Sequence, residues 1–294
     1  MKTLVVAPYP PIRDGIGAYA AQQVRALRRA GHDVEVLSPM PSAAHHHRDL
    51  LGPRGALALG RLARGFDRVI IHFHQDVFFP RPSTPESRRS TARALTAAFR
   101  IGPPVTLVLH EVIYGWLDDT DDAAPQLKKM FRAAAAIDVH VAEHRDVLVE
   151  KAGVRPDRIT LVDHGADFVA RTTVDQATAR RSLGLPAEGH LFLSIGFVAP
   201  HKGFDRAIRA FAGLGDQGAE LHVVGSVRVD DPIANDHRRQ LERLAAETPG
   251  VHLHLGFVGD EAFDRWIVAA DTVVLPYRHI WSSGVAERAA LYDR

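Results

Sequence analysis

Short apolar runs alternate with longer amphipathic stretches along almost the whole chain, and this alternation limits the fold more than any other feature. The short runs are typical of buried strands, and the stretches between them carry apolar residues at helical spacing. Strands separated by helices in this way favour an α/β fold, in which a mostly parallel sheet is covered on both faces.

One interruption of this pattern predicts two domains. Strands are expected at residues 4–7, 34–37, 68–73, 105–109, 136–141 and 159–162, and again at 191–195, 220–224, 251–255 and 272–275. Between the two groups, residues 165–189 are mostly polar and hold one expected helix, 175–183, with Asp175 as its N-cap and Gly184 after its end. We therefore expect domains at residues 1–170 and 171–294. The second is short for a domain, and its last expected helix still runs near Arg294, so we expect it to be partial.

Composition excludes several classes of protein. The net charge is +1, from 36 basic and 35 acidic residues, so no overall field attracts nucleic acid and no nucleic-acid partner is expected. The absence of cysteine excludes disulfides, thiolate metal sites and cysteine nucleophiles, and it fits a reducing cytosol. No apolar run approaches the roughly 20 residues that span a bilayer. A cytoplasmic location is therefore expected.

A first candidate motif, Gly15, Ile16 and Gly17, follows the first expected strand and opens the first expected helix, 18–30. Glycine lets backbone N–H groups approach a phosphate or sugar closely, and a helix N-terminus adds partial positive charge. Ala20 stands where the dinucleotide fingerprint has its third glycine, which argues against standard NAD binding. The alternative is a loop that merely turns the chain.

A second candidate motif holds Gly196 and Lys202, between an expected strand and a helix from Phe204. A lysine beside a helix N-terminus can hold a diphosphate as a point charge. This is not a Walker loop, because Gly203 follows Lys202 where that loop has serine or threonine. An exposed lysine in an ordinary turn is the alternative.

A third candidate motif follows the last expected strand. Ser282 or Ser283 could cap the next helix and leave N–H donors for a ligand. Glu287, in the first turn, could accept hydrogen bonds from the two hydroxyls of a ribose. The alternative is an acidic residue that only stabilises the helix start.

A fourth candidate motif, His110 and Glu111, ends the expected strand 105–109. Ligands of open α/β sheets bind beyond the carboxyl ends of strands, and a histidine there can donate to a sugar hydroxyl or transfer a proton. A structural histidine is the alternative, since His72 and His74 stand in similar positions. All four motifs fall at strand ends, and this shared placement is more informative than any one of them.

Taken in order, these motifs resemble the retaining GT-B glycosyltransferases of the family 4, group 1 type. The resembling segments are residues 8–19, 155–168, 194–203 and 282–287. The resemblance implies two Rossmann-like, doubly wound parallel-sheet domains that face each other across a cleft, the second incomplete. It also implies a hexosyl-type transferase that moves sugar from a nucleotide-diphosphate sugar to a glycan, lipid-linked or small-molecule acceptor. A lipid-linked acceptor would bring peripheral contact with the inner face of the membrane.

The resemblance also implies roles for individual residues. The catalytic set would be His110 at the transferred sugar, Lys202 at the diphosphate and Glu287 at the ribose. Gly284 and Val285 would offer backbone N–H groups to the diphosphate. The full substrate-binding set would be Gly15, Ile16, Gly17, Glu111, Gly196, Lys202, His279, Ser283, Gly284, Val285 and Glu287. No metal and no other cofactor is expected, because such enzymes stabilise the leaving group with cationic side chains and helix ends.

Two departures from the family pattern favour other functions. Phe197 stands where the family usually has arginine, and His279 where it has a glutamate; Arg278 could replace the lost cation. These departures favour a non-catalytic GT-B module that binds a nucleotide sugar or a partner protein. A sugar-nucleotide epimerase is a third possibility, and the missing fingerprint argues against a dehydrogenase.

Three polar or basic segments are interpreted as solvated surface. Residues 118–122 are acidic and residues 45–47 are histidines, but neither has the spacing of a metal site. Residues 54–64 could form a basic amphipathic helix that rests on a membrane, with an ordinary solvated helix face as the favoured interpretation.

Overall fold

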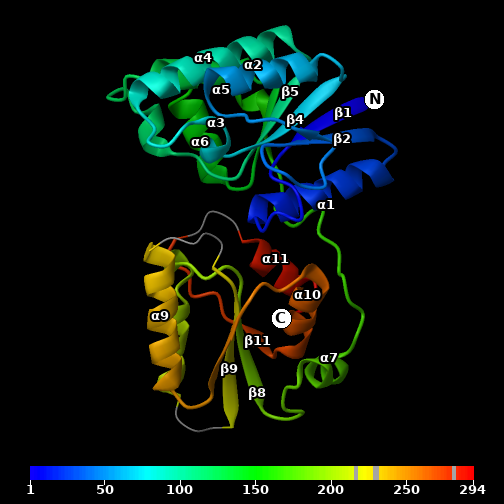
Figure 1. Cartoon of the computed structure of the whole chain (residues 1–294), viewed down its shortest axis with the longest axis vertical. Coiled ribbons are helices and arrows are strands. Elements are labelled where there is room, and N and C mark those ends of the chain that lie inside the picture. The colour runs from blue at the N-terminus through cyan, green and yellow to red at the C-terminus, as the bar shows by residue number, and fades with distance from the viewer. Residues whose placement is uncertain (215–217, 228–231, 280–282) are drawn as a thin grey trace. The chain divides into compact units, whose positions relative to one another are not determined.

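A computed structural model describes the whole chain except residues 215–217, 228–231 and 280–282. The chain divides into two compact units, Met1–Asp167 and Phe168–Arg294. Each unit is a parallel sheet with helices packed against it (Figure 1). The division falls inside the polar stretch that interrupts the pattern of strands and helices. The predicted α/β fold with two parallel sheets is confirmed.

The first unit is built on a seven-stranded sheet in the order β3-β2-β1-β4-β5-β6-β7. All neighbouring strands are parallel. The strands are β1 (Lys2–Val6), β2 (Asp33–Ser38), β3 (His46–His47), β4 (Arg68–Phe73), β5 (Val105–Leu109), β6 (Ala136–Val139) and β7 (Ile159–Leu161). Most central residues of these strands are fully buried, so both faces of the sheet need a covering layer.

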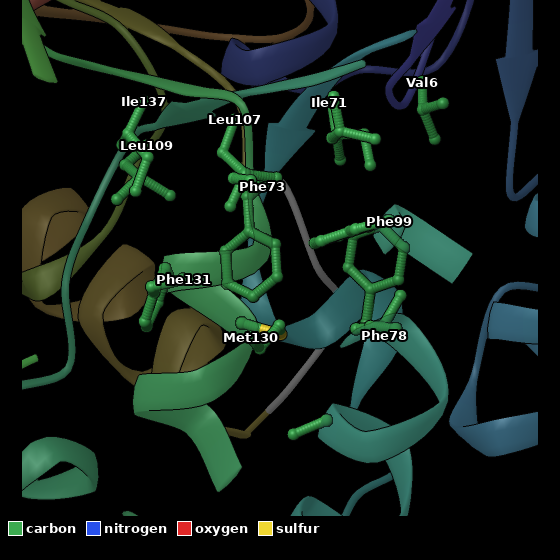
Figure 2. Packing of buried hydrophobic residues seen from close by; sticks show 14 of the residues in the cluster. Val6, Ile71, Phe73, Phe78, Phe99, Leu107, Leu109, Met130, Phe131 and Ile137 are labelled. Carbon is green, nitrogen blue, oxygen red and sulfur yellow. The ribbon is translucent and has the colours of Figure 1, made fainter. Parts of the chain in front are cut away.

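Helices supply that cover. They are α1 (Gly15–Arg29), α2 (Gly52–Ala63), α3 (Gln75–Phe78), α4 (Pro85–Ile101), α5 (Ala124–Ala133) and α6 (Ala142–Glu150), with short 3-10 helices η1 (Tyr114–Leu117) and η2 (Pro156–Arg158). In Figure 1, α2, α4 and α5 lie on one side of the sheet and α1 lies on the other. Figure 2 shows the core beneath the first group, where Phe73 of β4 packs against Phe78 and Phe131 with ring centroids 5.4 and 5.9 Å away.

The second unit has a four-stranded parallel sheet in the order β10-β9-β8-β11. Its strands are β8 (His190–Ile195), β9 (Ala219–Gly225), β10 (Val251–Leu255) and β11 (Thr272–Val273). Its helices are α7 (Gln176–Leu183), η3 (Pro200–Lys202), α8 (Phe204–Ala212), α9 (Pro232–Ala246), α10 (Asp260–Ala269) and α11 (Gly284–Ala290). The predicted start and end of α7 are confirmed: Asp175 accepts a hydrogen bond from the Thr178 amide at 2.7 Å, and Gly184 follows with a φ of 68°.

The predicted strands all occur, with bounds that are as predicted or shift by at most two residues. Helix α1 begins at Gly15 rather than at residue 18, because Asp14 caps it. Two elements of the first unit have no counterpart among the predictions: β3, a two-residue edge strand, and α3, a helix of a single turn. Among the described residues, no helix combines the length and apolarity that crossing a membrane requires.

Candidate functional site

In the second unit, three loops meet at the carboxyl ends of the strands. Gly196 follows β8 with a φ of 136°, and a Cβ on it would lie 3.7 Å from Cγ2 of Val285 in α11. Gly225 ends β9 with a φ of 157°, and a Cβ there would lie 1.7 Å from the Gly196 carbonyl oxygen. Neither position tolerates a side chain in this conformation. The structure thus brings together Gly196 and Val285, which the sequence assigned to one site.

Lys202 ends η3 beside these loops. Its Nζ lies 4.3 Å from the centre of the Tyr277 ring, and the Tyr277 hydroxyl lies 3.1 Å from the Ser283 hydroxyl. In the part of the chain that the structure describes, no carboxylate forms an ion pair with Lys202. Burial lowers its pKa below the ordinary value for lysine. An ammonium group that is poorly hydrated and lacks a carboxylate partner is well suited to bind a phosphate.

Ser283 is the residue that caps α11. Its Oγ accepts a hydrogen bond from the Ala286 amide at 3.1 Å, while Ser282 lies outside the described residues. Gly284 and Val285 are the first two residues of α11, and Glu287 lies in its first turn. Lys202, Ser283 and Val285 therefore lie around one strand end of the second unit. His279 lies in the exposed bend before α11.

Arg278 does not replace the cation that Phe197 lacks. Its guanidinium donates to both oxygens of the buried Asp205, at 2.8 and 2.7 Å. This pairing holds the pKa of Asp205 at about 2, so the carboxylate stays charged and neutralises the arginine. The sequence-based suggestion that Arg278 acts as a free second cation is wrong, since Arg278 is a structural partner of Asp205.

The first amides of α1 already have a hydrogen-bond acceptor within the chain. Asp14 Oδ1 accepts hydrogen bonds from the amides of Ile16 and Gly17, at 2.9 and 3.2 Å. A Cβ on Gly17 would lie 3.1 Å from the Pro8 carbonyl oxygen, while one on Gly15 would meet nothing within 4 Å. The glycine motif predicts that these amides approach a phosphate or a sugar. The Asp14 carboxylate already binds two of them, and its negative charge disfavours a second anion there.

In the first unit, four adjacent strands carry a histidine at or just beyond their carboxyl ends. His72 lies in β4, and His110, His140 and His164 follow β5, β6 and β7. The ring of Tyr19 contacts all four, with centroid distances from 4.8 to 5.6 Å. We call these four residues the histidine row. His110 was predicted as a site residue, whereas His140 and His164 were not.

Hydrogen bonds orient the histidine row. The Nδ1 atom of His72 lies 3.1 Å from Nε2 of His110, and Nδ1 of His140 lies 3.1 Å from the Val162 carbonyl oxygen. The carbonyl accepts a hydrogen bond from the N–H at Nδ1, which leaves Nε2 of the neutral His140 ring as a hydrogen-bond acceptor. Beside the row, Nε2 of His74 lies 3.1 Å from Oε1 of Glu111, and this contact lowers the Glu111 pKa. Glu111 therefore has a partner within its own unit.

The histidine row is uncharged at neutral pH. Burial lowers the pKa of His72 to about 3 and that of His164 to about 4. It also lowers the pKa of His110 and His140 below the ordinary value for histidine. Neutral imidazoles donate to and accept from hydroxyl groups, as a sugar requires. One ring nitrogen each from His110, His140 and His164 lies within 4.8 Å of the others, so these three could also hold a metal ion.

The buried state of His72 predicts a pH-dependent stability. Its folded-state pKa lies below that of an unfolded histidine, so the unfolded chain binds more protons between about pH 6.5 and pH 3. The resulting stability is complete above pH 6.5 and falls by about 1.4 kcal/mol per pH unit below it. Urea unfolding of the full chain at pH 7, 6 and 5 should show a slope at least this steep, because the other three histidines of the row add to it, and His72→Leu should reduce the slope by about 1.4 kcal/mol per pH unit. An equal slope in the variant would contradict the assignment.

The acidic and histidine-rich segments form ion pairs with neighbouring side chains. Within residues 118–122, Asp119 pairs with Lys128 at 2.6 Å and Asp121 pairs with Arg88 at 2.5 Å. His46 lies 2.6 Å from Glu35. Each of these side chains has its own partner, and the pair of Asp121 with Arg88 is largely buried rather than solvated.

The fold is shared with solved glycosyltransferase structures. An Anabaena protein, Alr3699/HepE, in complex with UDP-glucose aligns with a TM-score of 0.65 and 16% identity, over 99% of this chain and 78% of that one. Sucrose-phosphate synthase from Thermosynechococcus elongatus aligns with a TM-score of 0.68 and 15% identity, over 99% and 79%. At these identities the likeness shows the architecture, which is GT-B.

Residues 13–169 match the sequence model of Glycosyltransferase Family 4, and residues 175–287 match that of Glycosyl transferases group 1. The chain belongs to glycosyltransferase family 4. A D-inositol 3-phosphate glycosyltransferase from Streptomyces scabiei is 30% identical over 195 residues, which are 61% of this chain and 44% of that enzyme. A mannosylfructose-phosphate synthase from Agrobacterium fabrum is 31% identical over 143 residues, 46% and 31% of the two chains. The chain spans less than half the length of these curated relatives.

Proposed function

We propose that this chain transfers a hexosyl group from a nucleotide-diphosphate sugar to a hydroxyl of an acceptor, with retention at the anomeric carbon. The acceptor oxygen forms a bond to that carbon while the bond to the diphosphate breaks. The acceptor proton passes to the leaving phosphate. The observation that carries the proposal is Lys202, a partly buried ammonium beside the glycine loops and without a carboxylate partner among the described residues.

The second unit supplies groups suited to the donor. Lys202 would neutralise the diphosphate as negative charge develops on it. The amides of Gly284 and Val285 would donate to the same group, and Glu287 would accept hydrogen bonds from the ribose hydroxyls. Because Phe197 replaces one family cation and Arg278 is neutralised by Asp205, this chain would depend on Lys202 more strongly than a relative with two cations.

The first unit supplies groups suited to sugar hydroxyls. His110 would contact the transferred sugar, and the neutral histidine row can both donate and accept hydrogen bonds around it. The names of the relatives support UDP-hexose as the first donor to test and a phosphorylated polyol or sugar as the first acceptor. A lipid-linked acceptor would place the protein at the inner face of the membrane, and a small-molecule acceptor in the cytoplasm.

Nucleotide binding and transfer test the proposal together. UDP, GDP and ADP are each added to the purified chain, and at least one should raise its melting temperature. The matching hexose donor should then give a glycosylated acceptor or slow release of free sugar. We expect EDTA to leave the rate unchanged, because the proposed stabilisation needs no metal. A rate that collapses in EDTA and returns with added metal would instead show that transfer depends on a bound ion. No thermal shift with any nucleotide would contradict the function.

A second candidate function is favoured by Phe197 and His279. On this reading the chain binds a nucleotide sugar without transferring it, because charge stabilisation in the transition state is too weak. Glu287→Ala separates the two functions. Turnover that is present in the unaltered chain and lost in this variant would exclude a purely binding role.

A further inference from the structure

A second cluster of metal-ligand side chains lies on the sheet of the second unit, away from the loops described above. Glu220 and His222 are two residues apart in β9, so both point to the same face of the sheet. His252 of β10 is the register partner of His222. The two imidazole rings are stacked, with centroids 4.8 Å apart and planes at 22°. Gly225 marks the end of β9 at the loops of the candidate site. Glu220 lies about 16 Å from it along the strand.

The donor atoms of these three side chains converge. Oε2 of Glu220 lies 2.9 Å from Nε2 of His222, and Oε1 lies 3.7 Å from Nε2 of His252. One donor atom from each of the three lies within 4.8 Å of the others. A tetrahedral zinc ion with bonds of about 2.0–2.2 Å separates its ligand atoms by about 3.3–3.6 Å. The distances from Glu220 to the two imidazoles bracket that separation, so a small rotation of the side chains would bring the donor atoms to the spacing of zinc ligands.

A further residue orients the buried histidine. Nδ1 of His222 lies 2.9 Å from Nε2 of His254, and the ring of Trp266 packs 4.7 Å from the His254 ring. Nε2 of His222 is also within hydrogen-bond distance of Oε2 of Glu220, so a metal ion would displace the proton at that contact, and the proton on Nδ1 would be donated to His254. Metal-binding histidines are oriented by such a hydrogen bond from the nitrogen that does not bind the metal. A surface ion pair between Glu220 and His222 would not require this orienting hydrogen bond to His254.

Solvent can reach the cluster from one side. The His222 side chain is 4% exposed, whereas those of His252 and Glu220 are 47% and 32% exposed. An ion could enter from that side and keep water as a fourth ligand.

We propose that Glu220, His222 and His252 bind a divalent transition-metal ion, with zinc as the best fit. The ion would link the edge strand β10 to β9. Two imidazoles and one carboxylate form a ligand set that zinc uses in proteins, and the carboxylate offsets one of its charges.

The test uses the full chain without an affinity tag, after treatment with a chelator. Titration with Co²⁺ should give a visible absorption band that saturates at one ion per chain, and Zn²⁺ should abolish the band by displacement. His252→Ala removes a half-exposed ligand and should weaken Zn²⁺ binding by at least about 10–100-fold, as should Glu220→Gln. His254→Phe, which changes only the orienting residue, should weaken it by about 10–100-fold.

The histidine row provides the matched control. His140→Ala removes a comparable histidine from the first unit and should leave Zn²⁺ affinity unchanged. If this variant loses binding while His252→Ala retains it, the ion belongs to the first unit and the proposal is wrong. An absence of stoichiometric binding to the unaltered chain would equally overturn it. The proposal does not depend on sugar transfer, so any thermal shift that a nucleoside diphosphate gives with the unaltered chain should persist in His252→Ala.

Discussion

Lys202→Ala should lower the rate of sugar transfer by about 10²–10³-fold, which is the usual loss when one group that stabilises transition-state charge is removed. The structure makes a loss at the upper end of this range the expected result. Phe197 offers no charge, and the guanidinium of Arg278 is held by Asp205. The measurement is kcat with the preferred nucleotide sugar, together with the melting-temperature shift that the nucleoside diphosphate alone produces.

Two further variants make the Lys202 result specific. Lys202→Arg keeps the charge and should recover part of the rate, with a remaining loss from the different shape of the guanidinium. Lys128→Ala removes a lysine that pairs with Asp119 in the first unit, and it should have no effect on kcat. A Lys202→Ala enzyme within threefold of the unaltered rate would show that the diphosphate is neutralised elsewhere.

Asp264→Ala should destabilise the second unit by about 3–5 kcal/mol, because it leaves a buried guanidinium without its counterion. Asp264 is fully buried in α10 and Arg288 of α11 is 6% exposed. The Nε atom of Arg288 donates to Oδ1 of Asp264 at 2.6 Å, and the Arg171 amide donates to Oδ2 at 3.0 Å. The Tyr292 hydroxyl donates to the same carboxylate. The free energy of unfolding in urea measures the loss.

A double variant separates an unpaired charge from lost packing. Asp264→Leu with Arg288→Met replaces the ion pair by apolar side chains of similar size, and such replacements are often neutral or stabilising. We expect it to recover most of the stability that Asp264→Ala loses. Equal destabilisation by both variants would mean that hydrogen bonds to Arg171 and Tyr292, rather than the buried charge, hold α11 against α10.

The fold was predictable because its strands are short and continuous apolar runs. Strands such as β4 and β5 have the bounds that the sequence predicts. Helix α7 was predictable from its cap, since Asp175 and Gly184 carry signals that depend on neighbouring residues only. Edge strand β3 could not be predicted, because it has two residues and is held by pairing with β2.

The candidate site was predictable only in part. Placement at strand ends identified Lys202 and His110, because parallel strands bring their carboxyl ends to one edge. Whether a charge is free depends on contacts across long stretches of sequence. Arg278 and Asp205 are 73 residues apart, and their pairing gives no signal in the sequence. His110 was selected because it follows the carboxyl end of a strand. The same criterion, applied to β6 and β7, would have identified His140 and His164.

The contacts of Arg278 have a consequence for the energetics of ligand binding. Besides Asp205, its guanidinium donates to the Pro200 carbonyl at 2.6 Å, and its amide donates to the His201 carbonyl at 2.8 Å. These hydrogen bonds hold the segment that carries Lys202 against the loop that carries Arg278, even without a bound ligand. On the proposed function, little backbone entropy would remain to be lost when a nucleotide binds, so the Lys202 ammonium would act at nearly its full strength.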